Sequence, residues 1–267
     1  ETSDAGLFAQ EAAALALTYA GRLPDADSLI AGLEEAARAS PDRPLGARVP
    51  ALRGLYWQLT GQPMPAAQAY REAALRCDEL HDIHGQAAAV FNLGCVLADT
   101  GQFDEALAAF RRALRDLGRL GIVTDLALAL YNTGLLLLQL GDLEAATRTA
   151  RRLRDEAGAT KAEAFMAYAS SLDADIARRR GAPRTALPLY LAAEVAFACA
   201  GNHPMAEASA LARAETMAET GQAAEALIAW GRIRSTAASP VVSPAAASLG
   251  DEMLALAQGH IVLALPP

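Results

Sequence analysis

The sequence predicts an all-α solenoid of six helical hairpins, because three features recur every 40 residues along the chain. A glycine holds this spacing without drift, at Gly21, Gly61, Gly101, Gly141, Gly181 and Gly221. An alanine stands five residues after each glycine, at Ala26, Ala66, Ala106, Ala146, Ala186 and Ala226. A small residue stands seven residues before each glycine, at Ala14, Gly54, Gly94, Gly134, Ala174 and Ala214. We therefore expect function on the surface of a stack rather than in a catalytic cleft.

One repeat, residues 87–126, shows why each unit should fold as a hairpin. Residues 87–100 contain no proline and place their apolar side chains at helical spacing. Gly101 then provides the left-handed conformation that ends a helix at low cost. Residues 102–117 again have helical periodicity and carry acidic residues in the first turn, where the helix dipole favours them. A turn this short forces the two helices to lie antiparallel.

Two further positions of the repeat predict its core. Nine residues after the turn glycine comes a large side chain in every unit but the fourth, where Ala150 stands; the five are Ile30, Tyr70, Phe110, Tyr190 and Trp230. Four residues before the glycine comes a second apolar position, with Ala177 as its exception; its members are Leu17, Trp57, Leu97, Leu137 and Met217. Apolar residues at helical period are usually core, so we expect both sets to pack between helices.

The predicted organisation is one continuous domain over residues 1–267, because each unit of a solenoid contacts mainly its neighbours. The six repeats cover about 7–46, 47–86, 87–126, 127–166, 167–206 and 207–234. A connector follows at 235–244, where Pro240 and Pro244 interrupt the helical pattern. Residues 245–260 are expected to form a helix that caps the stack.

Composition excludes several classes of function. The net charge of −8 argues against nonspecific nucleic-acid binding by this segment. No apolar run reaches the ~18 residues of a membrane span. Three widely spaced cysteines form neither a zinc pattern nor a disulfide framework, so a reducing cytoplasm is the expected location.

The sequence also predicts no catalytic, cofactor or metal site. It contains neither a glycine-rich phosphate loop nor a nucleophile elbow. His81 and His84 could ligate a metal if they lay on a helix. They fall in the expected linker between the second and third repeats, so we favour a solvated pair there.

The third repeat contains Asn92-Leu93-Gly94, Gly101-Gln102-Phe103-Asp104-Glu105-Ala106, Phe110 and Ala113. These residues resemble the consensus of the tetratricopeptide repeat (TPR). A second match is Asn132, Gly134 and Gly141-Asp142-Leu143-Glu144-Ala145-Ala146, and a third is Gly54, Gly61, Ala66, Tyr70 and Ala73. The resemblance covers about residues 7–234 and is strongest over 47–157. The long period resembles that of bacterial TPR regulators; HEAT repeats share it but lack the paired glycine and alanine pattern.

The resemblance implies a right-handed superhelix whose first helices line a concave face and bind ligands there. It places the inward side chains two, three, six, nine, ten and thirteen residues before each turn glycine. The ligand-binding residues predicted in this way are Phe91, Asn92, Asp99, Tyr131, Asn132, Gln139, Asp175, Arg178 and Arg179.

The strongest of these signals is the pair Asn92 and Asn132, which occupy the same inward position in adjacent repeats. An asparagine amide offers a donor and an acceptor, so such a pair could clamp the backbone of an extended peptide. The alternative is that both amides bind water or a neighbouring helix. Phe91 and Tyr131, beside them, would then supply apolar pockets.

Arg178 and Arg179 provide a further expectation about the ligand. They could pair with an acidic group, or they could be neutralised by Asp173 and Asp175 on the same helix as a solvated cluster.

The leading hypothesis is therefore a non-catalytic module that binds a protein or an extended peptide on its concave face. One alternative is the sensor domain of a bacterial transcription regulator. Another is a scaffold that self-associates into a homo-oligomer through exposed apolar residues of the second helices.

Overall fold

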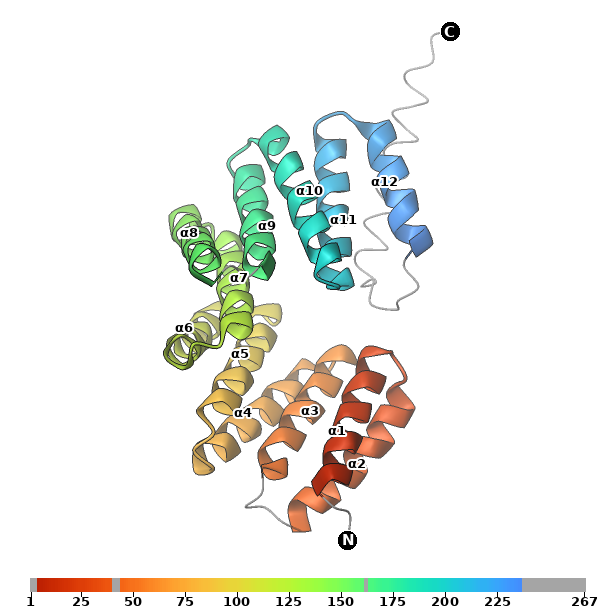
Figure 1. Cartoon of the computed structure of the whole chain (residues 1–267), viewed down its shortest axis with the longest axis vertical. Helices are drawn as coiled ribbons and strands as arrows, with labels where there is room; N and C mark the ends of the chain where they lie inside the picture. Colours follow the sequence, from red (N-terminus) through yellow and green to blue (C-terminus); the bar gives the residue numbers. More distant parts are fainter. Residues whose placement is uncertain (1–3, 40–43, 161–162, 237–267) are drawn as a thin grey trace. The chain divides into compact units, whose positions relative to one another are not determined.

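The structure is a computed structural model, and it describes residues 4–39, 44–160 and 163–236. Within these residues every regular element is an α-helix, as the sequence predicts. The helices follow one another as six hairpins, and we refer to the odd-numbered helices as first helices and the even-numbered ones as second helices (Figure 1).

The chain divides into two compact units, residues 1–132 and 133–267, and the boundary falls inside α7. Each unit is described by itself. The first contains α1 (Asp4–Tyr19), α2 (Leu23–Ala39), α3 (Leu45–Leu59), α4 (Pro63–Glu79), α5 (Ile83–Asp99), α6 (Phe103–Leu120) and the beginning of α7 (Val123–Gln139). The second contains the end of α7, then α8 (Leu143–Thr160), α9 (Glu163–Arg179), α10 (Pro183–Cys199), α11 (His203–Glu219) and α12 (Ala223–Thr236).

The turn inside each hairpin is built as the sequence predicts. All six recurring glycines have positive φ, between 71° and 83°. The turn between hairpins uses the same left-handed conformation at Gly121, Gly201 and His81, which has a φ of 55°. The sequence did not predict this second left-handed turn, because the turn after the second repeat carries His81 in place of a glycine.

The first helices begin earlier than the repeat pattern suggests. Helix α5 starts at Ile83 because the Asp82 side chain caps it, accepting a hydrogen bond of 2.9 Å from the Gly85 N–H. The expectation that His84 lies in a linker was therefore wrong. His84 stands in the first turn of α5, and its Nε2 lies 2.7 Å from Asp125 Oδ2 in the first turn of α7.

The core lies between the two helices of each hairpin and between successive hairpins. The predicted large side chains are buried, with exposed fractions of 7% or less, at Ile30, Tyr70, Phe110, Tyr190 and Trp230. The small residues allow these rings to approach. A Cβ placed on Gly54 would lie 2.8 Å from the Tyr70 ring, and one on Gly94 would lie 2.7 Å from the Phe110 ring.

Neighbouring hairpins are also joined by ion pairs at one recurring pair of positions. An acidic or basic residue thirteen after one turn glycine pairs with its opposite eight before the next. Glu34 binds Arg53 at 2.7 Å and Glu194 binds Arg213 at 2.9 Å; the signs are exchanged where Arg154 pairs with Asp173. All three pairs span 19 residues, so they follow the repeat rather than chance surface contacts.

Helix α12 continues to Thr236, two residues into the predicted connector. The rest of that connector and the predicted capping helix at 245–260 lie outside the described residues. Across the described part of the chain, every helix is too short or too polar to cross a membrane.

Candidate ligand-binding site

In the first unit, the structure leaves the Asn92 amide available on α5. Its side chain is half-buried, and it has no hydrogen-bond partner among the residues that the structure describes. Asp99 is exposed at the C-terminal end of the same helix. Asn132 differs, because its Nδ2 donates a 2.9 Å hydrogen bond to the Leu128 carbonyl one turn earlier. The two asparagines occupy equivalent positions, but within the described ranges Asn132 has one donor engaged and Asn92 has none.

The two aromatic residues beside the asparagines contribute to packing. Phe91 is half-buried, and its ring lies 5.6 Å from that of Phe110, measured between centroids. Tyr131 is 9% exposed and is a core residue. This burial contradicts the expectation that other positions fill the core and leave Tyr131 open.

In the second unit, inward positions of three successive first helices surround one cavity of about 670 Å³. Leu135, Leu138 and Gln139 come from α7, Asp175, Arg178 and Arg179 from α9, and Glu219 from α11. Four of the predicted site residues, Gln139, Asp175, Arg178 and Arg179, are thus brought together. All seven lining residues stand at positions that the resemblance assigns as inward.

The charged groups of this cavity pair differently from the expectation. Arg178 binds Glu215 at 3.3 Å and Glu219 at 2.5 Å, both on the next first helix. Asp173 pairs with Arg154 instead, and Asp175 accepts a hydrogen bond of 2.5 Å from the Tyr190 hydroxyl. We did not predict the acidic residues of α11, although Glu219 shares the repeat position of Gln139 and Arg179.

Arg179 is the cation of this cavity that remains available. It is exposed, and it has no ion-pair partner within the described residues. Burial lowers the pKa of Arg178, but Glu219 and Tyr190 outweigh this effect, so the pKa is raised overall and the guanidinium stays charged. Burial raises the pKa of Asp175, against the lowering effects of Tyr190 and of the two arginines.

The raised pKa of Asp175 predicts a dependence of stability on pH. Ionising this carboxyl is harder in the folded than in the unfolded chain, so its contribution to stability falls as pH rises through the raised pKa. An asparagine keeps an acceptor for Tyr190 without the charge. We expect Asp175→Asn to gain free energy of unfolding relative to wild type as pH rises from below the ordinary carboxyl pKa to neutrality. Urea denaturation at a series of pH values measures this difference, and a constant difference would contradict it.

The first two hairpins add inward residues that the sequence reasoning missed. Phe8, Leu15 and Tyr19 on α1 and Leu59 on α3 stand at inward positions and are between 41% and 64% exposed. Apolar side chains gathered in the open on neighbouring helices are typical of interaction surfaces. The same repeat rule would have found them, had it been applied to the first two repeats as well.

A family model of the tetratricopeptide repeat matches residues 87–116, which lie on α5 and α6. No relative is found among curated proteins by sequence comparison.

Solved structures give the same fold at low identity. The apo form of RapI is 17% identical, with 88% of this chain and 66% of RapI covered and a TM-score of 0.62. A Rap protein complexed with Competence and Sporulation Factor is 13% identical, with 87% and 76% covered and a TM-score of 0.64. The apo quorum sensor NprR from B. thuringiensis is 12% identical, with 92% and 68% covered and a TM-score of 0.64.

These likenesses agree with the repeat that the residues themselves show. The matched segment carries the turn glycine, the facing alanine and the large core residue that recur every 40 residues. Residues 87–116 therefore match a tetratricopeptide repeat, and the chain has the helical-repeat fold of these solved structures.

Proposed function

We propose that this chain is a non-catalytic module that binds a protein or an extended peptide through the inward positions of its first helices. The observation that carries the proposal is the cavity on α7, α9 and α11, which presents an unpaired Arg179 beside Gln139 and two leucines. The Rap neighbour solved with Competence and Sporulation Factor supports it, because that protein has a comparable fold and holds a ligand.

The chemistry of the two units suggests what such a ligand carries. Arg179 is suited to a carboxylate, and the Gln139 amide can donate and accept hydrogen bonds to a peptide backbone. In the first unit, the exposed Phe8 and Tyr19 are suited to apolar side chains, and the free Asn92 amide to a backbone group. Tyr131 has no part in the proposal, because it is buried.

We expect the two asparagines to contribute unequally. Asn92→Ala should weaken peptide binding by about 0.5–1.5 kcal/mol, the usual net worth of a hydrogen bond. Asn132→Ala should cost less, since one of its donors already bonds Leu128. Isothermal titration calorimetry with a peptide enriched from a displayed library measures both. No loss for either variant would remove the asparagines from the site, and equal losses would contradict the expectation that Asn92 contributes more.

The same library tests the proposal as a whole. Arg179→Gln should weaken the affinity for acidic peptides about tenfold or more, because a hydrogen bond to a charged group contributes about 1.5–3 kcal/mol. Arg112→Gln is the matched control: it removes an exposed arginine on the second helix α6. Equal capture by wild type, Arg179→Gln and Asn92→Ala would move the ligand away from the first helices.

A second candidate is the sensory domain of a larger regulator. It is favoured by NprR, a quorum sensor of which this chain spans 68%. Expression of the complete gene product tests this candidate. A ligand that changes the DNA binding of the complete protein would support a regulator. A complete protein without a further domain would contradict it.

A further inference from the structure

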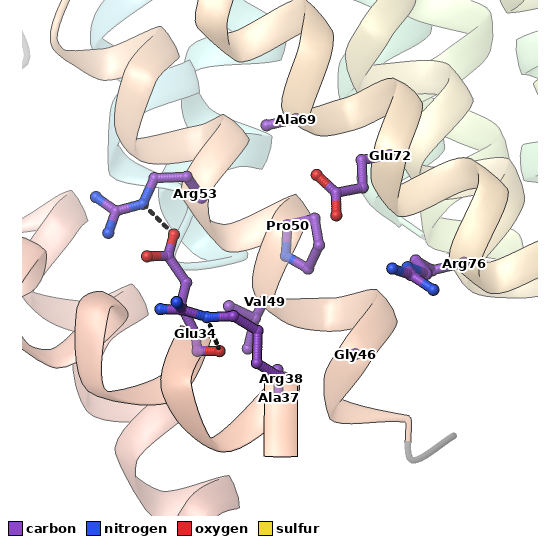
Figure 2. A pocket seen from close by; sticks show the side chains of 10 residues that line it. All are labelled: Glu34, Ala37, Arg38, Gly46, Val49, Pro50, Arg53, Ala69, Glu72 and Arg76. Carbon is purple, nitrogen blue, oxygen red and sulfur yellow. Dashed lines mark hydrogen bonds and ion pairs between the residues drawn. The ribbon is translucent and has the colours of Figure 1, made fainter. Parts of the chain in front are cut away.

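A second cavity, of about 350 Å³, lies in the first unit between the second helices α2 and α4 and over α3 (Figure 2). It is lined by residues outside the inward positions, so it goes beyond the proposed function. Its floor contains Gly46, Val49 and Pro50 of α3. In the next hairpin, Gln86 and Val90 stand at the positions of Gly46 and Pro50, and the Gln86 amide reaches Asp78 at 2.8 Å. A glycine in place of that glutamine leaves the space open.

The two walls of this cavity carry the same pair of charges. Glu34 and Arg38 come from α2, and Glu72 and Arg76 come from α4 (Figure 2). Members of each pair are four residues apart, which is about 6 Å along a helix. Figure 2 shows Glu72 and Arg76 on one wall, Pro50 between the walls, and the Arg38 side chain lying beside Glu34 on the other wall.

The local ion pairs occupy one glutamate of the cavity and leave the other open. Arg53, which also lines the cavity, binds Glu34 and Asp27, whereas Glu72 has no hydrogen-bond or ion-pair partner among the described residues. On the first wall, the Arg38 Nε donates to the main-chain oxygen of Glu34 at 3.2 Å, and Arg38 has no ion-pair partner among the described residues.

Within the part of the chain that the structure describes, the ion-pair partner of Arg76 is the exposed Glu79, at 3.3 Å. An exposed pair of this kind contributes little, so Arg76 remains available to a ligand.

We propose that this cavity binds a small zwitterion, with an ammonium group between the glutamates and a carboxylate between the arginines. A short aliphatic chain joining these groups would lie on Val49 and Pro50. The cavity has the size of small-molecule sites in proteins, about 300–1,000 Å³. A simple anion or cation fits less well, because it pairs with only one kind of charge and leaves the other without a counter-charge.

Calorimetric titration of the purified chain with 4-aminobutyrate tests the proposal, with butyrate and butylamine as probes that each lack one charge. We expect the zwitterion to bind at least about tenfold more tightly than either probe, since each lost contact to a charged group is worth a tenfold change or more. Glu72→Gln and Arg76→Gln should each weaken the binding of 4-aminobutyrate by about the same factor. Arg112→Gln should bind as wild type does.

Gly46→Gln provides a test that keeps every charge. It places in the floor the residue that the next hairpin has there, and glutamine is a better helix former than glycine. A normal melting temperature with loss of binding is the expected result. No binding of 4-aminobutyrate by wild type, equal binding of butyrate, or full binding by Gly46→Gln would each overturn the proposal.

Discussion

Replacing Phe110 by alanine should lower the free energy of unfolding by about 3–5 kcal/mol, the usual cost of removing a buried aromatic side chain. Phe110 is 1% exposed, and its ring fills the space beside Gly94 and packs against Phe91. Urea denaturation of wild type and variant measures the loss.

Leu75→Ala is the matched control for this substitution. Leu75 is 65% exposed on α4, so its truncation should change the free energy of unfolding by no more than about 0.5 kcal/mol. A loss below about 1 kcal/mol for Phe110→Ala would mean that the recurring large residue does not hold the hairpins together.

Gly94→Ala should destabilise the protein by about 1–3 kcal/mol, although alanine favours helix more than glycine does. The new Cβ would lie 2.7 Å from two carbons of the Phe110 ring, and that buried ring has no room to move aside. Thermal and urea unfolding measure the cost. In the Phe110→Ala background the cost should fall, because the contact that causes it is gone.

Gly32→Ala is the control with the opposite expected sign. Nothing lies within 4 Å of the place where its Cβ would stand on α2. The substitution should therefore stabilise the protein by about 0.4–1 kcal/mol. The same sign for both substitutions would refute the assignment of Gly94 to a close contact between helices.

The recurring glycines made the fold predictable from sequence. A glycine held at one spacing gives both the position of each turn and its left-handed conformation, and Gly101 and Gly141 adopt it as expected. The large residue nine positions later follows from the same phase, which is why the burial of Tyr70 and Phe110 could be stated in advance. The structure at these positions depends on local backbone geometry, which is the same in each repeat.

The partners of the charged residues could not be predicted in the same way. Arg178 has acidic residues nearby on its own helix, yet it binds Glu215 and Glu219 of the next first helix. The carboxylate that lies closest to Arg178 depends on how successive hairpins pack, and the residues of one helix do not predict this packing. The Asn132 amide bonds a carbonyl one turn earlier in its own helix, whereas Asn92 at the equivalent position has no such partner among the described residues, so the repeat position alone does not decide this bond.

The open cavity between α2 and α4 was not predicted, because the sequence prediction used only positions that carry the same kind of residue in successive repeats. Gly46 and Pro50 differ from Gln86 and Val90 of the next repeat, and a glycine in place of glutamine leaves space in the floor. In a repeat protein, shared positions predict the fold, whereas departures from the repeat are the places to look for a site.

Hydrogen–deuterium exchange, with and without a peptide enriched from the library, tests the central claim most directly, that ligands bind the inward positions of the first helices. The account predicts slower exchange in first helices such as α5 and α9, with exchange in the second helices unchanged. Protection confined to second helices such as α6 and α10 would contradict it.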